Sequence, residues 1–322
     1  MPGNAVCVLS ERKETGWIEM TYCNAMFETE EEKLRFVLES EERFRAGVHA
    51  VAERILAARP RIVTLSGPTC SGKTTTARIL IARLAERGFR VRVISIDDFY
   101  RNRDELAEIA RQKGVAYDWD SFASIDSAEL KQFIDGVLAG RTVRCPKYDF
   151  LRKERCGFET VEAGEYDAVV FEGIQAIYPQ VTAMFGEEPV CSVYISVGDD
   201  ITACGMEFSS REIRFLRRLV RDYRFRGTLP AQTFDVWHTV VENERKNIEP
   251  YAGYAEMRID STLQYELFVI ADEAVSLLAQ VTPESGSYAE ARNLILRLSA
   301  LPRLERRLVP ADSVFREFIG AE

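Results

Sequence analysis

Short apolar runs alternate with longer segments of helical periodicity between about residues 61 and 260. The runs are rich in β-branched residues and predict buried strands: RIVTLS (61–66), RVRVISI (90–96), DAVVFEG (167–173), VCSVYISV (190–197) and a further candidate, AEMRID (255–260). Between the first two, KTTTARILIARLAERG predicts a helix closed by Gly88. Strands that alternate with helices are typical of βαβ units, so the chain is predicted to be an α/β protein with a doubly wound, mostly parallel sheet.

Outside this alternation, the sequence predicts an N-terminal appendage and several further elements of a single domain. Residues 1–45 are acidic and weakly patterned, which predicts a short N-terminal appendage to a domain spanning 46–322. Polar and apolar residues alternate around a polar turn at about 141–164, which predicts a β-hairpin arm that stands off the sheet. Further elements expected are a helical lid segment at about 205–230 with a long helix at 211–226, a second helix at 232–246, and C-terminal helices at 263–322.

The sequence GPTCSGKTTT (67–76) joins the first predicted strand to its helix and matches the pattern GxxxxGK[ST]. Such a loop turns successive backbone N–H groups inward to form an anion nest, to which the helix N-terminus adds its positive end. The lysine of the pattern reaches the β and γ phosphates, and the following hydroxyl can ligate Mg²⁺. We therefore expect the loop to hold ATP, with a ligand-free glycine-rich turn as the alternative. The predicted contacts are Gly67, Pro68, Thr69, Cys70, Ser71, Gly72, Lys73, Thr74 and Thr75.

Two carboxylates are predicted at the ends of neighbouring strands. Asp97, in SIDDFYRNR (95–103), follows the second strand at the sheet edge where ligands bind in open α/β folds. It is placed to accept a proton from a substrate hydroxyl that attacks the γ-phosphate, unless Asp97 or Asp98 instead caps the next helix. Glu172 ends VVFE in a Walker-B-like position that suits Mg²⁺ with Thr74, the alternative being a carboxylate in a loop.

The segment REIRFLRRLVRDYRFRG (211–227) predicts an amphipathic helix with an arginine-rich face. The apolar face carries Ile213, Leu216, Val220 and Tyr223, and the nearly opposite face carries Arg211, Arg214, Arg218 and Arg221. Taken alone, an arginine face of this kind is more often solvated. Because arginines that close over transferring phosphates are a common kinase device, the P-loop favours a lid.

Composition narrows the classes of function that the chain can have. The 322 residues are 46% hydrophobic and carry a net charge of -9, which argues against broad nucleic-acid binding. No apolar run reaches the roughly 20 residues that span a bilayer, and the start lacks a signal-peptide layout, so we expect a cytoplasmic protein. The 7 cysteines form no CxxC pair, and His49 and His238 are the only histidines. Catalysis is therefore expected to use carboxylates and cations rather than zinc or a histidine triad.

Several motifs occur in one order along the chain: GPTCSGKTT, SIDDFY, DWDSFASID, PKYDF, FEGIQAI and RRLVRDYRFRG. Their order and spacing resemble the uridine kinase and phosphoribulokinase family of P-loop kinases. Three later segments, TFDVWHTVVENERKNIEPY, YELFVI and SVFREFIG, resemble a bacterial subgroup of uridine kinase-like proteins that carry a threonyl-tRNA synthetase-like N-terminal region. The resemblance covers roughly residues 46–321 and implies a P-loop kinase fold.

The resemblance also implies roles for individual residues. It makes Asp97 the catalytic base, assisted by Lys73 and Arg221, and makes Asp120 the ligand of the ribose hydroxyls. The phosphate-facing lid residues would be Arg218, Arg221 and Arg226, and the substrate-binding residues would be Tyr100, Trp119, Asp120, Tyr148, Phe150, Lys153 and Arg155. The aromatic residues could equally be core side chains, and Asp120 a turn residue.

Two departures from the animal uridine kinases leave the identity of the base open. This chain has Lys153 where those enzymes have a histidine in the hairpin, and Arg226, Gly227 and Thr228 where they have RGR. An ammonium group can only donate hydrogen bonds, so Lys153 would favour the carbonyl of uracil over the amino group of cytosine, unless it points into water.

These observations favour transfer of the γ-phosphate of ATP, with Mg²⁺, to the 5′-hydroxyl of a nucleoside, uridine or cytidine. The partners expected are a small-molecule nucleoside and no membrane, with a homo-oligomer left open. One alternative is a kinase of the same fold for another small alcohol, such as a sugar phosphate, glycerate or pantothenate. A phosphorylated substrate would want extra basic residues near Asp120, where the chain is aromatic and acidic. The other alternative, a nucleotide-binding module without turnover, would lose Asp97 or Glu172, and both are present.

Overall fold

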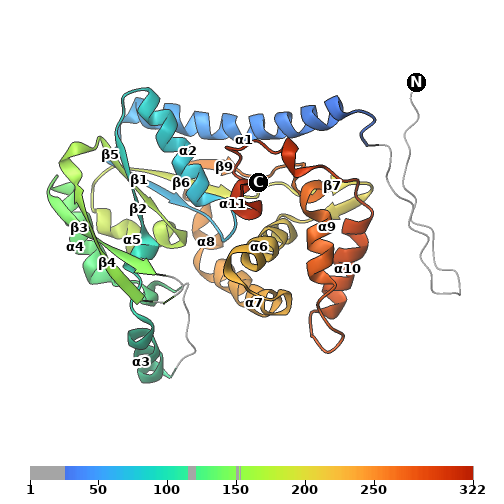
Figure 1. Ribbon diagram of the computed structural model, residues 1–322. Coiled ribbons are helices and arrows are strands. Elements are labelled where there is room, and N and C mark those ends of the chain that lie inside the picture. Colours follow the sequence, from blue (N-terminus) through green and yellow to red (C-terminus); the bar gives the residue numbers. More distant parts are fainter. Residues whose placement is uncertain (1–25, 115–120, 150–151, 153, 322) are drawn as a thin grey trace, which may run out of the picture. The chain divides into compact units, whose positions relative to one another are not determined.

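The computed structural model describes residues 26–114, 121–149, 152 and 154–321 (Figure 1). Of the predicted substrate-binding residues, Trp119, Asp120, Phe150 and Lys153 lie outside these ranges. The chain is divided into two compact units. One combines residues 46–196 with 239–259, and the other combines the chain up to residue 45 with 197–238 and 260–322.

A five-stranded sheet with the order β2-β5-β1-β6-β9 forms the centre of the first unit (Figure 1). Its strands are β1 (Ile62–Ser66), β2 (Val91–Ser95), β5 (Ala168–Glu172), β6 (Val190–Ser196) and β9 (Met257–Asp260). β1 pairs in parallel with both β5 and β6, and β2 pairs in parallel with β5. The order reverses at β1, which makes the sheet doubly wound and marks the place where ligands bind in such folds. The predicted α/β fold class is confirmed.

Buried apolar side chains explain why these segments form strands and helices. Every residue of β1 and β5 is buried, as expected for parallel strands covered on both faces. The helices of this unit are α2 (Lys73–Glu86), α3 (Arg103–Lys113), α4 (Ser127–Leu138), α5 (Pro179–Thr182) and α8 (Glu249–Ala252). Against the sheet, the rings of Phe99, Phe133, Phe171 and Phe185 follow one another with centroids 5.3, 6.3 and 5.3 Å apart.

A two-stranded hairpin, β3 (Thr142–Asp149) with β4 (Glu154–Glu162), confirms the predicted arm. The strands are antiparallel, with a register shift between Lys147 and Tyr148. Helix α4 packs closely against β3, because a Cβ added at Gly136 would lie 2.2 Å from the Val143 side chain. The hairpin is thus seated on α4 through a position that only glycine fits.

The second unit is mainly helical. Its elements are α6 (Ser210–Arg226), α9 (Glu266–Leu278), α10 (Tyr288–Ser299), α11 (Arg316–Ile319) and a small hairpin of β7 (Ile201–Ala203) with β8 (Met206–Phe208). Two helices, α1 (Glu30–Ala58) and α7 (Pro230–Asn247), contribute residues to both units. Helix α1 continues through residue 45, and the division of the chain at that residue into an appendage and a domain stays a prediction.

A buried ion pair joins α6 to α9 in this unit. The side chains of Arg217 and Glu266 are both 0% exposed, and they meet through two contacts, Nε to Oε2 at 2.5 Å and a terminal nitrogen to Oε1 at 2.8 Å. Arg217 also donates to the Ser261 carbonyl oxygen, and Glu266 accepts from the Leu263 N–H. Bidentate geometry and the added hydrogen bonds offset part of the cost of burying two charges, and burial still raises the pKa of Glu266 above its ordinary value.

Replacement of Glu266 by alanine should destabilise the protein strongly, because it leaves the Arg217 guanidinium buried without its counter-charge. We expect a loss of about 3 kcal/mol or more in the free energy of unfolding, measured by urea denaturation. The matched control is Asp272→Ala on the same helix, since Asp272 is 79% exposed in its pair with Arg303. That variant should lose under about 1 kcal/mol. Similar losses in the two variants would contradict the prediction.

Candidate active site

The register of the sheet brings three predicted site segments to one edge. Glu172, the last residue of β5, is paired with Leu65 of β1 on one side and with Ser95 of β2 on the other. Leu65 stands two residues before the loop that begins at Gly67, and Ser95 stands two residues before Asp97. The P-loop, Asp97 and Glu172 therefore follow the carboxyl ends of adjacent parallel strands.

The backbone of the P-loop takes the form that an anion nest needs. A Cβ at Gly67 would lie 2.0 Å from the carbonyl oxygen of Ile195 in β6, so the loop passes closer to that strand than any side chain allows. Cys70 and Gly72 have left-handed φ values of 59° and 87°. Ser71 is fully buried, and its hydroxyl has no hydrogen-bond partner among the described residues. These features fit a loop that wraps around an anionic ligand.

Lys73 begins helix α2 and lies folded onto its own loop. Its ammonium donates to the carbonyl oxygens of Gly67 and Pro68, both at 3.0 Å. Thr74 is exposed and Thr75 is buried, while the Thr76 hydroxyl donates to the Gly72 carbonyl at 2.8 Å. An exposed hydroxyl at the first turn suits the Mg²⁺ ligand expected at Thr74, and that role stays a prediction.

The adjacent residues Asp97 and Asp98 have different surroundings. Both lie in the 3₁₀ turn Ile96–Phe99 after β2, and helix α3 begins at Arg103 with Asn102 as its N-cap, so neither aspartate caps it. Asp98 accepts from the Lys147 ammonium at 2.8 Å and from the Tyr148 N–H at 3.2 Å. Asp98 therefore attaches the hairpin to this turn.

The charge of Lys147 is stabilised at this attachment. Burial acts against the ammonium, but the hydrogen bond and charge of Asp98 outweigh it and raise the pKa of Lys147 above its ordinary value. The Glu159 carboxylate lies 3.2 Å from the same ammonium. The hairpin is therefore held by an ammonium group whose charge its partners stabilise.

Asp97 lies beside the residue that follows Glu172. If Gly173 carried a Cβ, that atom would lie 3.8 Å from Asp97 Oδ1 and 3.4 Å from Gln175 Oε1. Glu172 itself is 7% exposed at the end of its strand. The predicted base and the predicted metal ligand thus belong to one small region of the sheet edge.

Gln175 was not predicted from the sequence, yet it organises the aromatic part of this region. It is fully buried, and its side-chain amide donates to the Tyr100 hydroxyl at 2.9 Å. The Tyr100 ring in turn packs against the Tyr148 ring of β3, with centroids 5.6 Å apart. A polar glutamine among apolar residues in GIQAI, two positions after the strand-end glycine, was the signal that could have identified it.

Arg155 of β4 connects the hairpin to two other segments. Its guanidinium donates to the Tyr100 carbonyl at 3.1 Å and pairs with Glu129 at 2.7 Å and with Asp126 at 3.5 Å, both at the start of α4. Its backbone N–H donates to Asn102. These contacts give Arg155 a structural role next to Tyr100, and its predicted contact with substrate stays a prediction.

The predicted lid arginines gather around one carboxylate in the second unit. Asp222 is 3% exposed and lies 3.2 Å from Arg218, 2.6 Å from Arg221 and 3.4 Å from Arg226. One negative charge thus collects three positive ones on α6. Arg214 on the same helix is nearly buried, 5.5 Å from the centre of the Trp237 ring. Contact between the three arginines and a phosphate stays a prediction.

A carboxylate that the sequence did not indicate lies against the P-loop. Glu244 of α7, in the first unit, is 4% exposed and accepts from the Thr69 N–H at 3.2 Å. The two residues are 175 positions apart, so no local spacing could have paired them.

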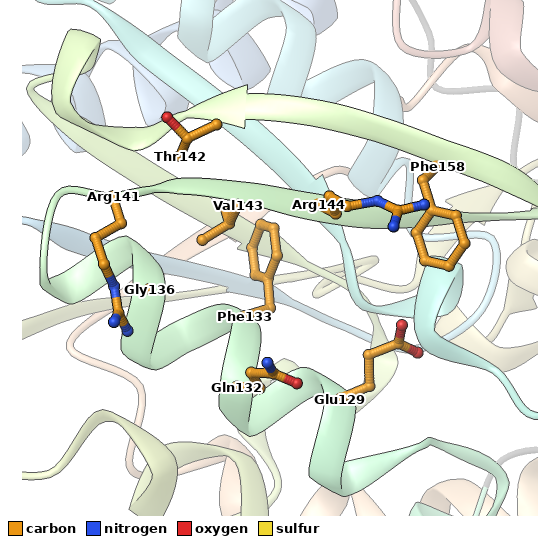
Figure 2. Close-up of a pocket in the computed structure, with 9 residues that line it drawn as sticks. All are labelled: Glu129, Gln132, Phe133, Gly136, Arg141, Thr142, Val143, Arg144 and Phe158. Carbon is orange, nitrogen blue, oxygen red and sulfur yellow. The ribbon is translucent and has the colours of Figure 1, made fainter.

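A separate groove of about 490 Å³ lies between α4 and the β3–β4 hairpin (Figure 2). Arg144 lies over the Phe158 ring at its rim, 4.1 Å from the ring centre. Glu129, Gln132, Arg141 and Thr142 add polar groups to its lining. None of the predicted site residues lines this groove, which is therefore distinct from the strand-end region.

The P-loop lies at the switch point of a parallel sheet, with Glu172 at the end of β5 and Asp97 after β2. This combination defines a nucleotide-dependent phosphotransferase of the P-loop class. Residues 62–267, more than half of the chain, match the model of the Phosphoribulokinase / Uridine kinase family. The chain belongs to this family of P-loop kinases, which implies the use of ATP and a small-molecule acceptor.

The chain is similar to several individual proteins. The chain is 30% identical over 203 residues to a uridine kinase of Deinococcus deserti, covering 62% of this chain and 87% of that protein. It is 28% identical to uridine-cytidine kinase B of Dictyostelium discoideum over 52% of this chain and 60% of that one. Among solved structures, a possible uridine kinase from Bacillus stearothermophilus is similar with a TM-score of 0.39 and 24% identity, covering 47% of this chain and 79% of the other.

One part of the expected resemblance finds no support in these matches. The family match begins at residue 62, and the reported relatives do not bear out a threonyl-tRNA synthetase-like N-terminal region. Within the described ranges, no helix combines the length and apolar character needed to cross a membrane.

Substitution of Gly67 by alanine should weaken nucleotide binding, because the new Cβ would overlap the Ile195 carbonyl and push the loop off the sheet. We expect ATP affinity, measured by calorimetry, to fall by at least about tenfold. The control is Gly253→Ala, since a Cβ there has nothing within 4 Å and φ is -66°. The control should bind ATP like the parent, and normal binding in Gly67→Ala would refute the packing argument.

Proposed function

We propose that the protein transfers the γ-phosphoryl group of ATP to the 5′-hydroxyl of a nucleoside, uridine or cytidine. The observation that carries the proposal is the strand register that brings the P-loop, Asp97 and Glu172 to one edge of the sheet. The packed pair of Tyr100 and Tyr148 next to this edge supports a planar acceptor. Relatives named uridine kinase support the same class of acceptor.

In the proposed reaction, the substrate hydroxyl oxygen attacks the γ-phosphorus as Asp97 accepts its proton. A bond forms from that oxygen to the γ-phosphorus, the bond to the β,γ-bridging oxygen breaks, and ADP leaves with the bond's electron pair. Lys73 exchanges its contacts with the Gly67 and Pro68 carbonyls for phosphate oxygens and offsets the charge that develops there. Arg218, Arg221 and Arg226 supply further positive charge.

The residues at the strand ends also fit a divalent cation. Thr74 offers an exposed hydroxyl at the start of α2, and Glu172 offers a carboxylate at the end of β5. Hard oxygen ligands of this kind are those that Mg²⁺ prefers. When bound, the ion would neutralise charge on the phosphates, while Asp97 remains the group that takes the proton.

Replacement of Asp97, Asp98 and Lys73 should give three different kinetic results. Asp97→Asn should keep ATP affinity while kcat falls by 10²-fold or more, because the proton acceptor is lost. Lys73→Ala should impair both ATP binding and kcat. Asp98→Asn weakens the contact with Lys147 and should mainly raise KM for the acceptor. Steady-state kinetics with varied ATP and acceptor separate these cases, and near-normal turnover by Asp97→Asn would remove its assignment as the base.

A screen of acceptors tests the substrate. Purified protein with ATP and Mg²⁺ is assayed for ADP release with nucleosides, sugar phosphates, glycerate and pantothenate, and turnover should be highest with uridine or cytidine. If turnover were highest with another alcohol, that alcohol would become the proposed acceptor in place of a nucleoside. Absence of turnover with all of them would favour a nucleotide-binding module.

The relative use of uridine and cytidine tests Lys153. If its ammonium donates to the base, kcat/KM should favour uridine by about tenfold or more, because cytosine presents a donor where uracil presents an acceptor. Lys153→Met should reduce this ratio towards one. Equal use of both nucleosides by the parent, or an unchanged ratio in the variant, would show that Lys153 does not contact the base.

A further inference from the structure

The carboxylate of Glu244 accepts a hydrogen bond from a backbone N–H of the P-loop, the loop predicted to hold phosphate. Glu244 lies on α7, is 4% exposed, and accepts a hydrogen bond from the Thr69 N–H at 3.2 Å. Both residues belong to the first unit. The loop therefore already donates one of its N–H groups to an anionic group of the chain itself.

Lys73 and Glu244 hold the two ends of one peptide group. The carbonyl oxygen of Pro68 accepts from the Lys73 ammonium at 3.0 Å, and the N–H of the same peptide, on Thr69, donates to Glu244. The dipole of this peptide is thus aligned between a positive and a negative side chain. Lys73 cannot keep this contact while its ammonium reaches the phosphates of a nucleotide, as the GxxxxGK[ST] pattern requires.

We propose that Glu244 is an internal competitor for the phosphate groups that bind at the P-loop. Its carboxylate and a bound polyphosphate are both anions. Glu244 already holds the Thr69 N–H, and a polyphosphate would use the N–H groups of the same loop together with the N-terminus of α2 and Lys73. Two such anions repel each other strongly in a buried site. Nucleotide binding therefore has to displace Glu244 from Thr69 or act against its charge.

If the contact between Glu244 and the Thr69 N–H were only structural, it would not require a carboxylate. Any neutral carbonyl or amide oxygen could accept from a single N–H group, whereas a buried carboxylate has a desolvation cost that positive groups nearby must offset. The Thr69 N–H that Glu244 occupies belongs to the loop whose N–H groups the phosphates need. The contact with Glu244 therefore stabilises the nucleotide-free loop at the expense of the nucleotide-bound one.

The test is nucleotide binding by the Glu244→Gln variant, which keeps a side-chain oxygen at this position and removes the charge. Titration calorimetry with ATP and Mg²⁺, without any acceptor, should give a Kd at least about fivefold lower than in the parent. The difference should shrink in high salt as charges are screened. An unchanged or higher Kd would overturn the proposal.

Glu242→Gln is the matched control, because Glu242 is exposed on the same helix and its loss changes the net charge equally. Its Kd for ATP should stay within about twofold of the parent value. An equal gain in affinity in both variants would assign the effect to net charge and overturn the proposal.

A folding defect is excluded by a second variant and a second measurement. Glu244→Asp keeps the charge but withdraws the carboxylate by one methylene, and it should bind ATP more tightly than the parent and less tightly than Glu244→Gln. In each folded variant the rise in Tm on adding ATP should exceed the rise in the parent, since a ligand that binds more tightly stabilises more. Equal or smaller rises would overturn the proposal.

The inference rests on nucleotide binding at the P-loop and goes beyond the proposed choice of acceptor. A parent protein that binds ATP but phosphorylates no nucleoside would remove the proposed function and leave the role of Glu244 to be decided by the Kd values. A parent protein that binds no ATP would overturn the role of Glu244 as well.

Discussion

Parallel pairing of β1 with β5 and of β5 with β2, in one register, is the constraint on which the candidate site depends. In this register Glu172 is paired with both Leu65 and Ser95. The P-loop, Asp97 and Glu172, which are distant in sequence, therefore lie at one edge of the sheet. Successive side chains of a strand point to opposite faces, and a slip of one residue would turn Glu172 and the start of the P-loop the other way. The fully buried strands oppose such a slip, because it would exchange every side chain between two packed faces.

The sequence was most informative where the relevant interactions are local. Runs of Val and Ile identified the strands, and GPTCSGKTTT identified the P-loop, because the glycines and the helix start that shape the loop lie within ten residues. The loop's close approach to Ile195 also agrees with the glycine at its first position. The sequence also predicted where helix α2 ends, because Gly88, just after the helix, has the positive φ expected of a closing glycine.

The residues that could not be predicted act through distant partners. Glu244 meets Thr69, and Gln175 meets Tyr100, only after the sheet has formed. Arg217 is a partial exception. It lies within the apolar stripe of its helix, between Ile213 and Val220, and a charged residue at such a position indicates a buried partner. The pattern could indicate that a partner exists, but not that it is Glu266.

Two consecutive aspartates in one short turn face different parts of the structure. In the 3₁₀ turn Ile96–Phe99, Asp98 is directed to the hairpin, where it holds Lys147 and the Tyr148 backbone, while Asp97 lies beside Gly173. The turn therefore connects the predicted base to the arm that carries Tyr148.

The single carboxylate of Asp222 has a consequence for the conformational entropy of the arginines around it. A free arginine loses about 2 kcal/mol of rotamer freedom when its side chain is fixed. Arg218, Arg221 and Arg226 already lie within 3.4 Å of Asp222, so part of that ordering is completed during folding rather than on contact with a ligand. The same carboxylate also reduces their mutual repulsion. Helix α6 thus carries a partly ordered arginine cluster, and a ligand that contacted it would meet a lower entropic cost of fixing these side chains.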